Sequence, residues 1–180
     1  AALAVGAQLC NVGMMAIPVR ILQKRRGLSV GELVVLRDHT LYGAELLRRS
    51  KLRILEGASV IAAQHHERYD GSGYPQGLRG REIGEEARIV AICDAFDAMT
   101  HRRPWRQSPL SVQAALKEIS RGATSQFDPV LAGLFVDLVH REFWKHDDFD
   151  AFLADGAHEH EYVRDRARIE KLLKNDQDKL

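Results

Sequence analysis

Residues 65–106 read HHERYDGSGYPQGLRGREIGEEARIVAICDAFDAMTHRRPWR, and they hold the densest polar chemistry of the chain. Two adjacent histidines come first, then a glycine-rich loop, then an apolar helical pattern interrupted by two acids. The loop, residues 70–84, contains five glycines and one proline. Long loops are uncommon in compact domains and often serve function. We therefore expect the functional site in this stretch.

Apolar residues recur with helical spacing on both sides of the loop. Ser29 followed by Glu32 is a capping box, and Ser108-Pro109 and Asp128-Pro129 are typical helix starts. The predicted helices span residues 1–9, 30–50 with a kink near Gly43, 55–69, 85–101, 108–122 and 128–145. Since no segment alternates as a strand does, the predicted fold class is all-α. Residues 1–146 form the main domain in this prediction, and residues 147–180 form a charged helical C-terminal extension.

Composition limits the classes of function. A chain of 180 residues with a formal net charge of +1 offers no bulk attraction for nucleic acid or for an anionic membrane. The apolar opening lacks the features of a signal peptide and is too short for a membrane span, so we expect a helix that begins upstream of Ala1. Cys10 and Cys93 lie in apolar stretches outside any CxxC pair, which is typical of reduced thiols in a cytosolic protein.

Histidines and acids in apolar surroundings are the first candidates for chemistry. His65 and His66 are neighbours on a predicted helix, where two rings can face one pocket. Asp94 interrupts an apolar run, and a buried carboxylate is very costly unless it is paired. Together with His39, these residues come from three helices and fit a metal site between helices. A structural pairing of Asp94 within the core fits the same spacing.

Basic and aromatic residues follow the acidic helix. Asp97 lies three residues beyond Asp94 and shares its face. Arg103 and Arg106 flank Pro104-Trp105, and guanidinium groups beside an aromatic ring suit a phosphodiester with a stackable base. A solvated basic turn explains the same residues equally well.

Taken together, these segments resemble the HD-GYP family, bacterial phosphodiesterases that hydrolyse cyclic di-GMP. The matching segments are RDHTLYGAELL, HHERYDGSGYPQGLRG, RIVAICDAFDAM, RRPWR and QFDP, within about residues 6–143. The resemblance implies an HD-superfamily helical bundle with a centre of two or three metal ions, iron or manganese preferred. It places His39, His65, His66 and Asp94 on metal-ligand positions.

The resemblance also assigns a ligand site. It puts Arg103 and Arg106 where basic residues hold the phosphates of the dinucleotide, with Asp97 and Tyr74 nearby. Gly73, Tyr74 and Pro75 are the GYP tripeptide, which is associated with pocket shape and with partner contacts.

One segment departs from the family pattern. Where the family has His-Asp followed by Gly-Lys, this chain has Cys10, Asn11 and then Gly13-Met14. An amide bridges two metal ions poorly, a thiolate favours softer ions, and methionine lacks the charge that assists a phosphate. We therefore predict a degenerate member with no confident catalytic residue, with one divalent metal, iron or manganese, at most. Three alternatives remain: a regulatory module, a cyclic di-GMP receptor, and an active phosphodiesterase with a site rebuilt around Cys10.

The resemblance also implies partners. We expect an upstream receiver or other sensory domain, as in two-component response regulators, and a GGDEF-type or other protein partner. A homodimer is a further expectation. Neither nucleic acid nor a membrane is expected, and the predicted location is the cytoplasm.

Overall fold

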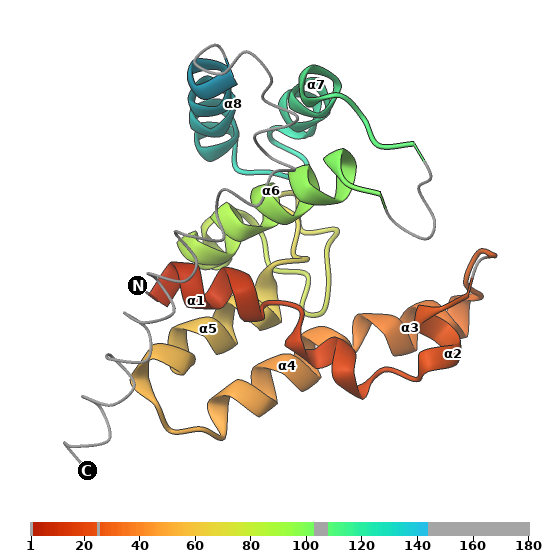
Figure 1. Cartoon of the computed structure of the whole chain (residues 1–180). Helices are drawn as coiled ribbons and strands as arrows, with labels where there is room; N and C mark the ends of the chain where they lie inside the picture. The colour runs from red at the N-terminus through yellow and green to blue at the C-terminus, as the bar shows by residue number, and fades with distance from the viewer. Residues whose placement is uncertain (1, 25, 103–107, 144–180) are drawn as a thin grey trace.

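The computed structural model describes residues 2–24, 26–102 and 108–143, and the regular elements in those ranges are all helices (Figure 1). Their β pairing is limited to two isolated bridges, Asp70 with Arg79 and Ala123 with Phe127. The predicted all-α fold is confirmed. In chain order the elements are α1 (Ala2–Leu9), the 3₁₀ turn η1 (Val12–Ala16), α2 (Val19–Leu22), α3 (Val30–Arg37), α4 (His39–Arg48), α5 (Arg53–Gln64), the 3₁₀ turn η2 (Gly80–Glu82), α6 (Glu85–Thr100), α7 (Val112–Gly122) and α8 (Pro129–Phe143).

Helix α6 crosses the middle of the molecule and contacts helices on both sides (Figure 1). On one side α5 packs against α4 and α1, and the fully buried Ala58 and Ala62 of α5 let these helices approach closely. On the other side α7 and α8 cover α6 through a core that includes Phe96 and Ile119. The first residue of α4 and the residues that directly follow α5 therefore lie beside α6.

Turn η1 lies directly on the start of α4. A Cβ atom added at Gly13 would lie 1.9 Å from the carbonyl oxygen of His39, and one added at Gly43 would lie 3.1 Å from the backbone nitrogen of Gly13. Only glycine fits at Gly13, because real side chains do not approach a backbone atom so closely. This contact brings Asn11 close to the helix that carries His39.

The prediction of one helix over residues 30–50 with a kink at Gly43 is wrong. The chain breaks at Asp38, between α3 and α4, and Gly43 lies inside α4 where it contacts η1. The predicted capping box is confirmed, since Ser29 Oγ accepts from the Glu32 N–H and Glu32 accepts from the Ser29 N–H. The break leaves His39 as the first residue of a new helix, a position that the periodicity did not indicate.

Two other helix boundaries differ from the prediction. Helix α5 ends at Gln64 and not near Tyr69, because the N–H of Tyr69 donates to the Gln126 carbonyl of the turn before α8. Helix α7 begins after Ser111, whose hydroxyl caps it, and not after Ser108. The start at Asp128-Pro129 is confirmed. The predicted boundary between residues 146 and 147, and the helical extension, lie outside the described residues.

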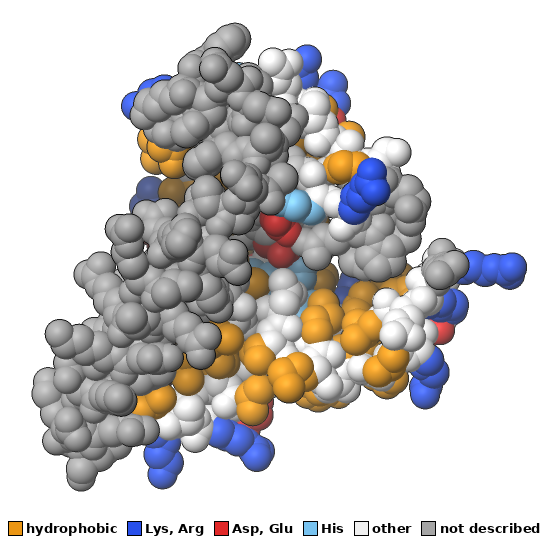
Figure 2. Space-filling view, viewed as in Figure 1, with side chains coloured by type: hydrophobic (Ala, Val, Ile, Leu, Met, Phe, Trp, Pro, Cys, Tyr) orange, Lys and Arg blue, Asp and Glu red, His pale blue; other side chains and the backbone are white. Residues whose placement is uncertain are grey.

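Apolar side chains are exposed along α3 and α4, and Figure 2 shows hydrophobic groups gathered on this part of the surface. Val34 and Leu46 are more than half exposed. None of the helices in the described ranges has the length and apolar character needed to cross a membrane.

Candidate metal and ligand site

Three histidines meet where α4 and the end of α5 lie beside α6. The potential ligand nitrogens of His39, His65 and His66 lie within 4.8 Å of one another. Their rings are 4.1 to 5.6 Å apart between centroids. His65 is the C-cap of α5 and His66 follows it, so the assumption that both lie within a helix is wrong. The pair nevertheless faces a single pocket, because the chain turns sharply after Gln64.

Backbone carbonyls orient two of the rings. Nδ1 of His39 lies 2.7 Å from the Leu36 carbonyl oxygen, and Nδ1 of His65 lies 3.0 Å from that of Ala62. Since a carbonyl only accepts, the proton resides on Nδ1 and Nε2 carries the free lone pair. Neither Nε2 atom, although buried, has a hydrogen-bond partner among the described residues.

These orphaned nitrogens fit a divalent metal. A metal-ligating histidine normally donates its other N–H to a carbonyl or carboxylate, which is the arrangement found here. Burial lowers the pKa of His39 and of His65, so both rings are neutral, as ligation requires. Burial lowers the pKa of His66 to about 2, and the neighbouring residues His65, His39 and Arg37 add to the shift because each disfavours a second positive charge nearby.

Asp94 and Asn11 form the opposite edge of the site. Asp94, on α6, is half-buried, and its Oδ1 accepts from Nδ2 of Asn11 at 3.4 Å. The amide of Asn11 thus donates to the carboxylate and adds no negative charge. The sequence left open whether Asp94 ligates a metal or pairs in the core. In the structure the carboxylate lines the same two cavities as His66, and it also accepts a hydrogen bond from Asn11.

In the metal-free protein Cys10 is a protonated thiol. The buried thiol donates to the Ala7 carbonyl at 3.1 Å, and burial together with the negative charge of Asp94 raises its pKa to about 11. Thiolate is the form that binds metals. Met14 lies nearby in the wall of a cavity, where it contributes apolar surface and no charge.

The glycine-rich loop is held by one carboxylate that the sequence reading did not single out. Glu67 is only 3% exposed, and its two oxygens accept from the N–H groups of Gln76, at 2.7 Å, and Leu78, at 3.1 Å. A Cβ added at Gly73 would lie 2.3 Å from the backbone nitrogen of Arg68, so glycine is required there. The peptide bond between Tyr74 and Pro75 is cis.

Tyr74 connects this loop to the histidines. Its ring stacks on His66 with 4.9 Å between centroids and 25° between planes. The guanidinium carbon of Arg37 lies 4.8 Å from the centroid of the tyrosine ring. Burial raises the pKa of Tyr74 to about 12, so the hydroxyl is protonated. Arg37 was missed because its neighbours in sequence show only an ordinary amphipathic helix.

Two cavities open from the histidines. The polar cavity has a volume of about 310 Å³ and includes Arg37, His65, His66, Tyr74 and Asp94 in its wall. The apolar cavity has a volume of about 750 Å³ and lies between the α2–α3 segment and α6, with Asn11, His66 and Asp94 at its polar edge. In Figure 2, acidic and histidine side chains lie at the bottom of a hollow at the centre of the molecule.

Of the other predicted site residues, one contacts a histidine outside the cluster and two fall outside the described ranges. Asp97 is exposed, and its carboxylate lies 3.0 Å from Nδ1 of His101. Arg103 and Arg106 fall outside the described residues. Cys93 is exposed on α6, and both cysteines are free, as the prediction of reduced thiols requires.

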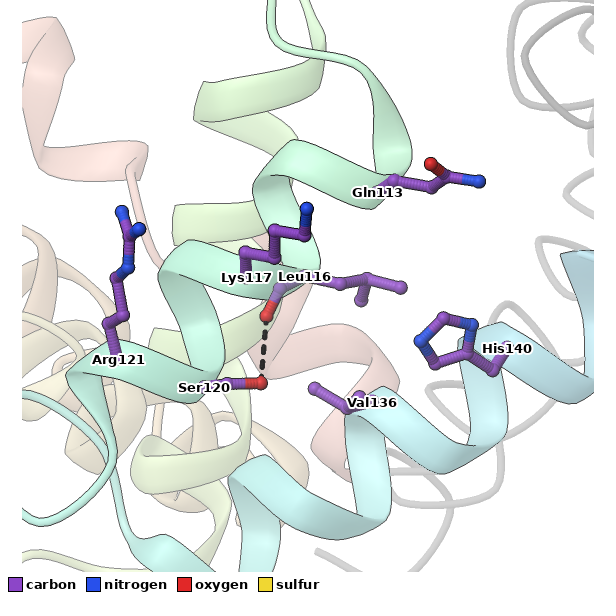
Figure 3. Close-up of a pocket in the computed structure, with 7 residues that line it drawn as sticks. All are labelled: Gln113, Leu116, Lys117, Ser120, Arg121, Val136 and His140. Atoms are coloured by element: carbon purple, nitrogen blue, oxygen red, sulfur yellow. Dashed lines mark hydrogen bonds between the residues drawn. The ribbon is translucent and has the colours of Figure 1, made fainter.

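A third cavity, of about 390 Å³, lies between α7 and α8 (Figure 3). Lys117 and Arg121 of α7 and His140 of α8 line it, and Arg121 pairs with Glu118 at 2.6 Å. Since its described wall contains no carboxylate and a single histidine, its chemistry differs from that of the histidine cluster.

Comparison with known proteins identifies the family. The model of the HD domain family matches residues 1–131, so the chain belongs to that family. Its relatives and its signature place it in the HD-GYP group.

The relatives are enzymes of cyclic dinucleotide metabolism by name. The chain is 41% identical over 132 residues to a cyclic di-GMP phosphodiesterase of Thermotoga maritima. The aligned region covers 73% of this chain and 36% of that protein. It is 43% identical over 123 residues to the cyclic di-GMP phosphodiesterase response regulator RpfG of Xanthomonas campestris, with 68% and 32% covered. A 3'3'-cGAMP-specific phosphodiesterase of Vibrio cholerae is 40% identical, with 72% and 24% covered. The chain thus spans about a third or less of these relatives.

Solved structures share the fold. An HDG"Y"P protein from Bdellovibrio bacteriovorus superposes with a TM-score of 0.60 at 21% identity, covering 77% of this chain and 43% of that one. A cyclic GMP-AMP specific phosphodiesterase of V. cholerae gives 0.57 at 17% identity, covering 85% and 42%. The predicted HD-superfamily bundle is therefore confirmed.

Proposed function

We propose that this domain binds a cyclic dinucleotide of the cyclic di-GMP type beside a single divalent metal, and that its hydrolytic activity is weak or lost. It then acts as a regulatory output module. The contact between the Asn11 amide and the Asp94 carboxylate carries this proposal. An amide that donates to one candidate ligand supplies no second anionic oxygen. The site therefore carries too little negative charge to hold two bridged metal ions.

The donor set supports one metal ion. His39, His65 and His66 offer three neutral imidazoles, and Asp94 offers one carboxylate at the same cavity. Imidazole and carboxylate ligands suit iron and manganese. When bound, the metal would supply positive charge for a phosphate oxygen of the ligand.

The shapes of the two cavities support a dinucleotide. A polar cavity beside the histidines suits a phosphate, and the larger apolar cavity suits a base. Pockets of about 300–1,000 Å³ are typical of small-molecule sites. The relatives named as cyclic dinucleotide phosphodiesterases narrow the ligand class to cyclic di-GMP or a similar molecule.

The alternative is an active phosphodiesterase with a site rebuilt around Cys10. The position of Cys10 argues against it, because the buried thiol donates to the Ala7 carbonyl and lines neither of the two cavities that open from the histidines. The names of the relatives favour it, so activity has to be measured.

A regulatory module also needs partners. The relative named as a response regulator supports an upstream receiver domain in the whole protein, and the exposed apolar side chains of α3 and α4 support a GGDEF-type or other protein partner, or a second copy of this chain. A cytoplasmic location agrees with these partners and remains a prediction.

The decisive experiment measures metal content, ligand binding and turnover on one preparation purified without oxygen or chelators. We expect about one equivalent of iron or manganese, binding of cyclic di-GMP by calorimetry, and no turnover above a metal-free control. Two or more equivalents of bound metal, together with turnover clearly above the metal-free control, would refute the proposal.

A gain-of-function variant sharpens this test. Restoring the family residues with Cys10→His, Asn11→Asp and Met14→Lys together should raise turnover at least about 100-fold, since a single charged or polar transition-state contact is worth that much. The matched control is Met15→Lys, which adds the same charge next door at a side chain that is 84% exposed. Equal turnover in both variants would show that residues 10, 11 and 14 do not limit hydrolysis.

A further inference from the structure

Arg37 is a positive charge without a carboxylate partner in the wall of the polar cavity. The described wall contains two arginines, Arg37 and Arg68. Arg68 is neutralised by Asp70, at 3.3 Å, and donates to the hydroxyl of Ser72. No carboxylate of the described residues pairs with Arg37, which is an exposed side chain at the last position of α3.

Tyr74 holds this arginine beside the histidines. The guanidinium lies 4.8 Å from the centroid of the tyrosine ring, within the range of a cation–π contact. The same ring stacks on His66 at 4.9 Å. A guanidinium that rests on an aromatic face keeps its N–H groups available for an anion. The stack therefore fixes Arg37 next to the metal site without using its donors.

The rest of the site leaves room for such a role. Of the other described cations around these cavities, Arg68 is paired with Asp70, and Lys24 and Arg26 line the apolar cavity and not the polar one. Met14 adds apolar surface only. An anionic ligand in the polar cavity therefore meets one positive side chain of the described wall that has no ion pair, Arg37, in a wall that also holds the carboxylates of Asp94 and Glu67.

We infer that Arg37 binds a phosphate of the ligand in the polar cavity, with two guanidinium N–H groups donating to two phosphate oxygens. This inference rests on the proposed function and adds a specific binding residue to it. It assigns the GYP-loop tyrosine a physical task, which is to position the arginine that binds the phosphate.

The test is calorimetry of the metal-loaded protein with cyclic di-GMP. Arg37→Ala should weaken binding about 10- to 100-fold, the loss expected for hydrogen bonds to a charged group. Arg37→Lys keeps the positive charge but loses the paired N–H groups of the guanidinium, so its affinity should lie between those of wild type and Arg37→Ala. The control is Arg53→Ala, an exposed arginine at the start of α5, the end of that helix opposite His65. It should bind as wild type does. Metal content and melting temperature should be the same in all four proteins.

The outcomes separate this inference from the proposed function. Wild-type affinity in Arg37→Ala would overturn the inference and leave the proposed function intact. Loss of metal or of folding in Arg37→Ala would also overturn it, because the role would then be structural. If wild type binds no cyclic dinucleotide, the proposed function fails, and inorganic phosphate titrated into the Co²⁺-loaded protein becomes the probe. Weaker phosphate binding in Arg37→Ala than in wild type would still support the arginine as the phosphate ligand, and equal binding would overturn it.

Discussion

Replacement of Glu67 should release the glycine-rich loop while leaving the helices in place. The Glu67 carboxylate is 3% exposed and accepts from the N–H groups of Gln76 and Leu78, nine and eleven residues further along the chain. It thereby closes the loop that carries Tyr74. Glu67→Gln and Glu67→Ala remove this support in two steps.

The structure sets the size of each step. A hydrogen bond to a charged acceptor contributes about 1.5–3 kcal/mol. Glutamine keeps one acceptor oxygen and turns an NH₂ group toward the second N–H, so Glu67→Gln should lower the free energy of unfolding by about 2 kcal/mol. Alanine leaves both N–H groups unpaired, and water reaches the exposed Gln76, so Glu67→Ala should lower it by about 3–4 kcal/mol.

Urea unfolding measures the stability, and amide hydrogen exchange at Gln76 and Leu78 locates the change. The matched control is Glu56→Gln on α5, the helix that precedes Glu67, where an exposed glutamate should change stability by less than about 0.5 kcal/mol. Binding of the dinucleotide should weaken in both Glu67 variants, because Tyr74 loses its position over His66. Unchanged exchange at the two amides, or stability equal to that of the control, would refute this reasoning.

Three further predictions concern the metal site and the core. Without metal, stability should fall as the pH drops below about 6.5, because burial lowers the pKa of the three clustered histidines and they bind protons only after unfolding; urea midpoints measured across that range, with and without added metal, test this. Asp128→Asn should lower stability by about 1–3 kcal/mol at neutral pH. Burial alone would raise the pKa of Asp128, but hydrogen bonds from backbone N–H groups and from Arg88 outweigh burial and lower it. The difference in stability between wild type and Asp128→Asn should therefore vanish as the pH falls through the lowered pKa of Asp128. A difference that stays the same at low pH would contradict this. Gly13→Ala should lower the melting temperature by several degrees, because its Cβ would lie 1.9 Å from the His39 carbonyl, whereas Gly31→Ala, with nothing within 4 Å, should not.

Local patterns in the sequence determined the fold class and most helices. Capping by Ser29 and Asp128 and the glycine-rich loop depend on interactions between residues close in sequence, and such interactions can be read directly from the chain. The signature around His65 and His66 determined the family in the same way. It also brought His39 and Asp94 into the candidate site, although they lie far away along the chain.

Tertiary structure alone decided how these residues meet. The end of α5 at Gln64 and the contact of Gly13 with α4 depend on segments distant in sequence, so periodicity could not predict them. The same holds for Arg37 over Tyr74 and for the protonation of Cys10, because both depend on burial and on neighbours brought together by folding. Sequence determines which chemical groups are present, and packing determines which of them share a cavity and in what protonation state.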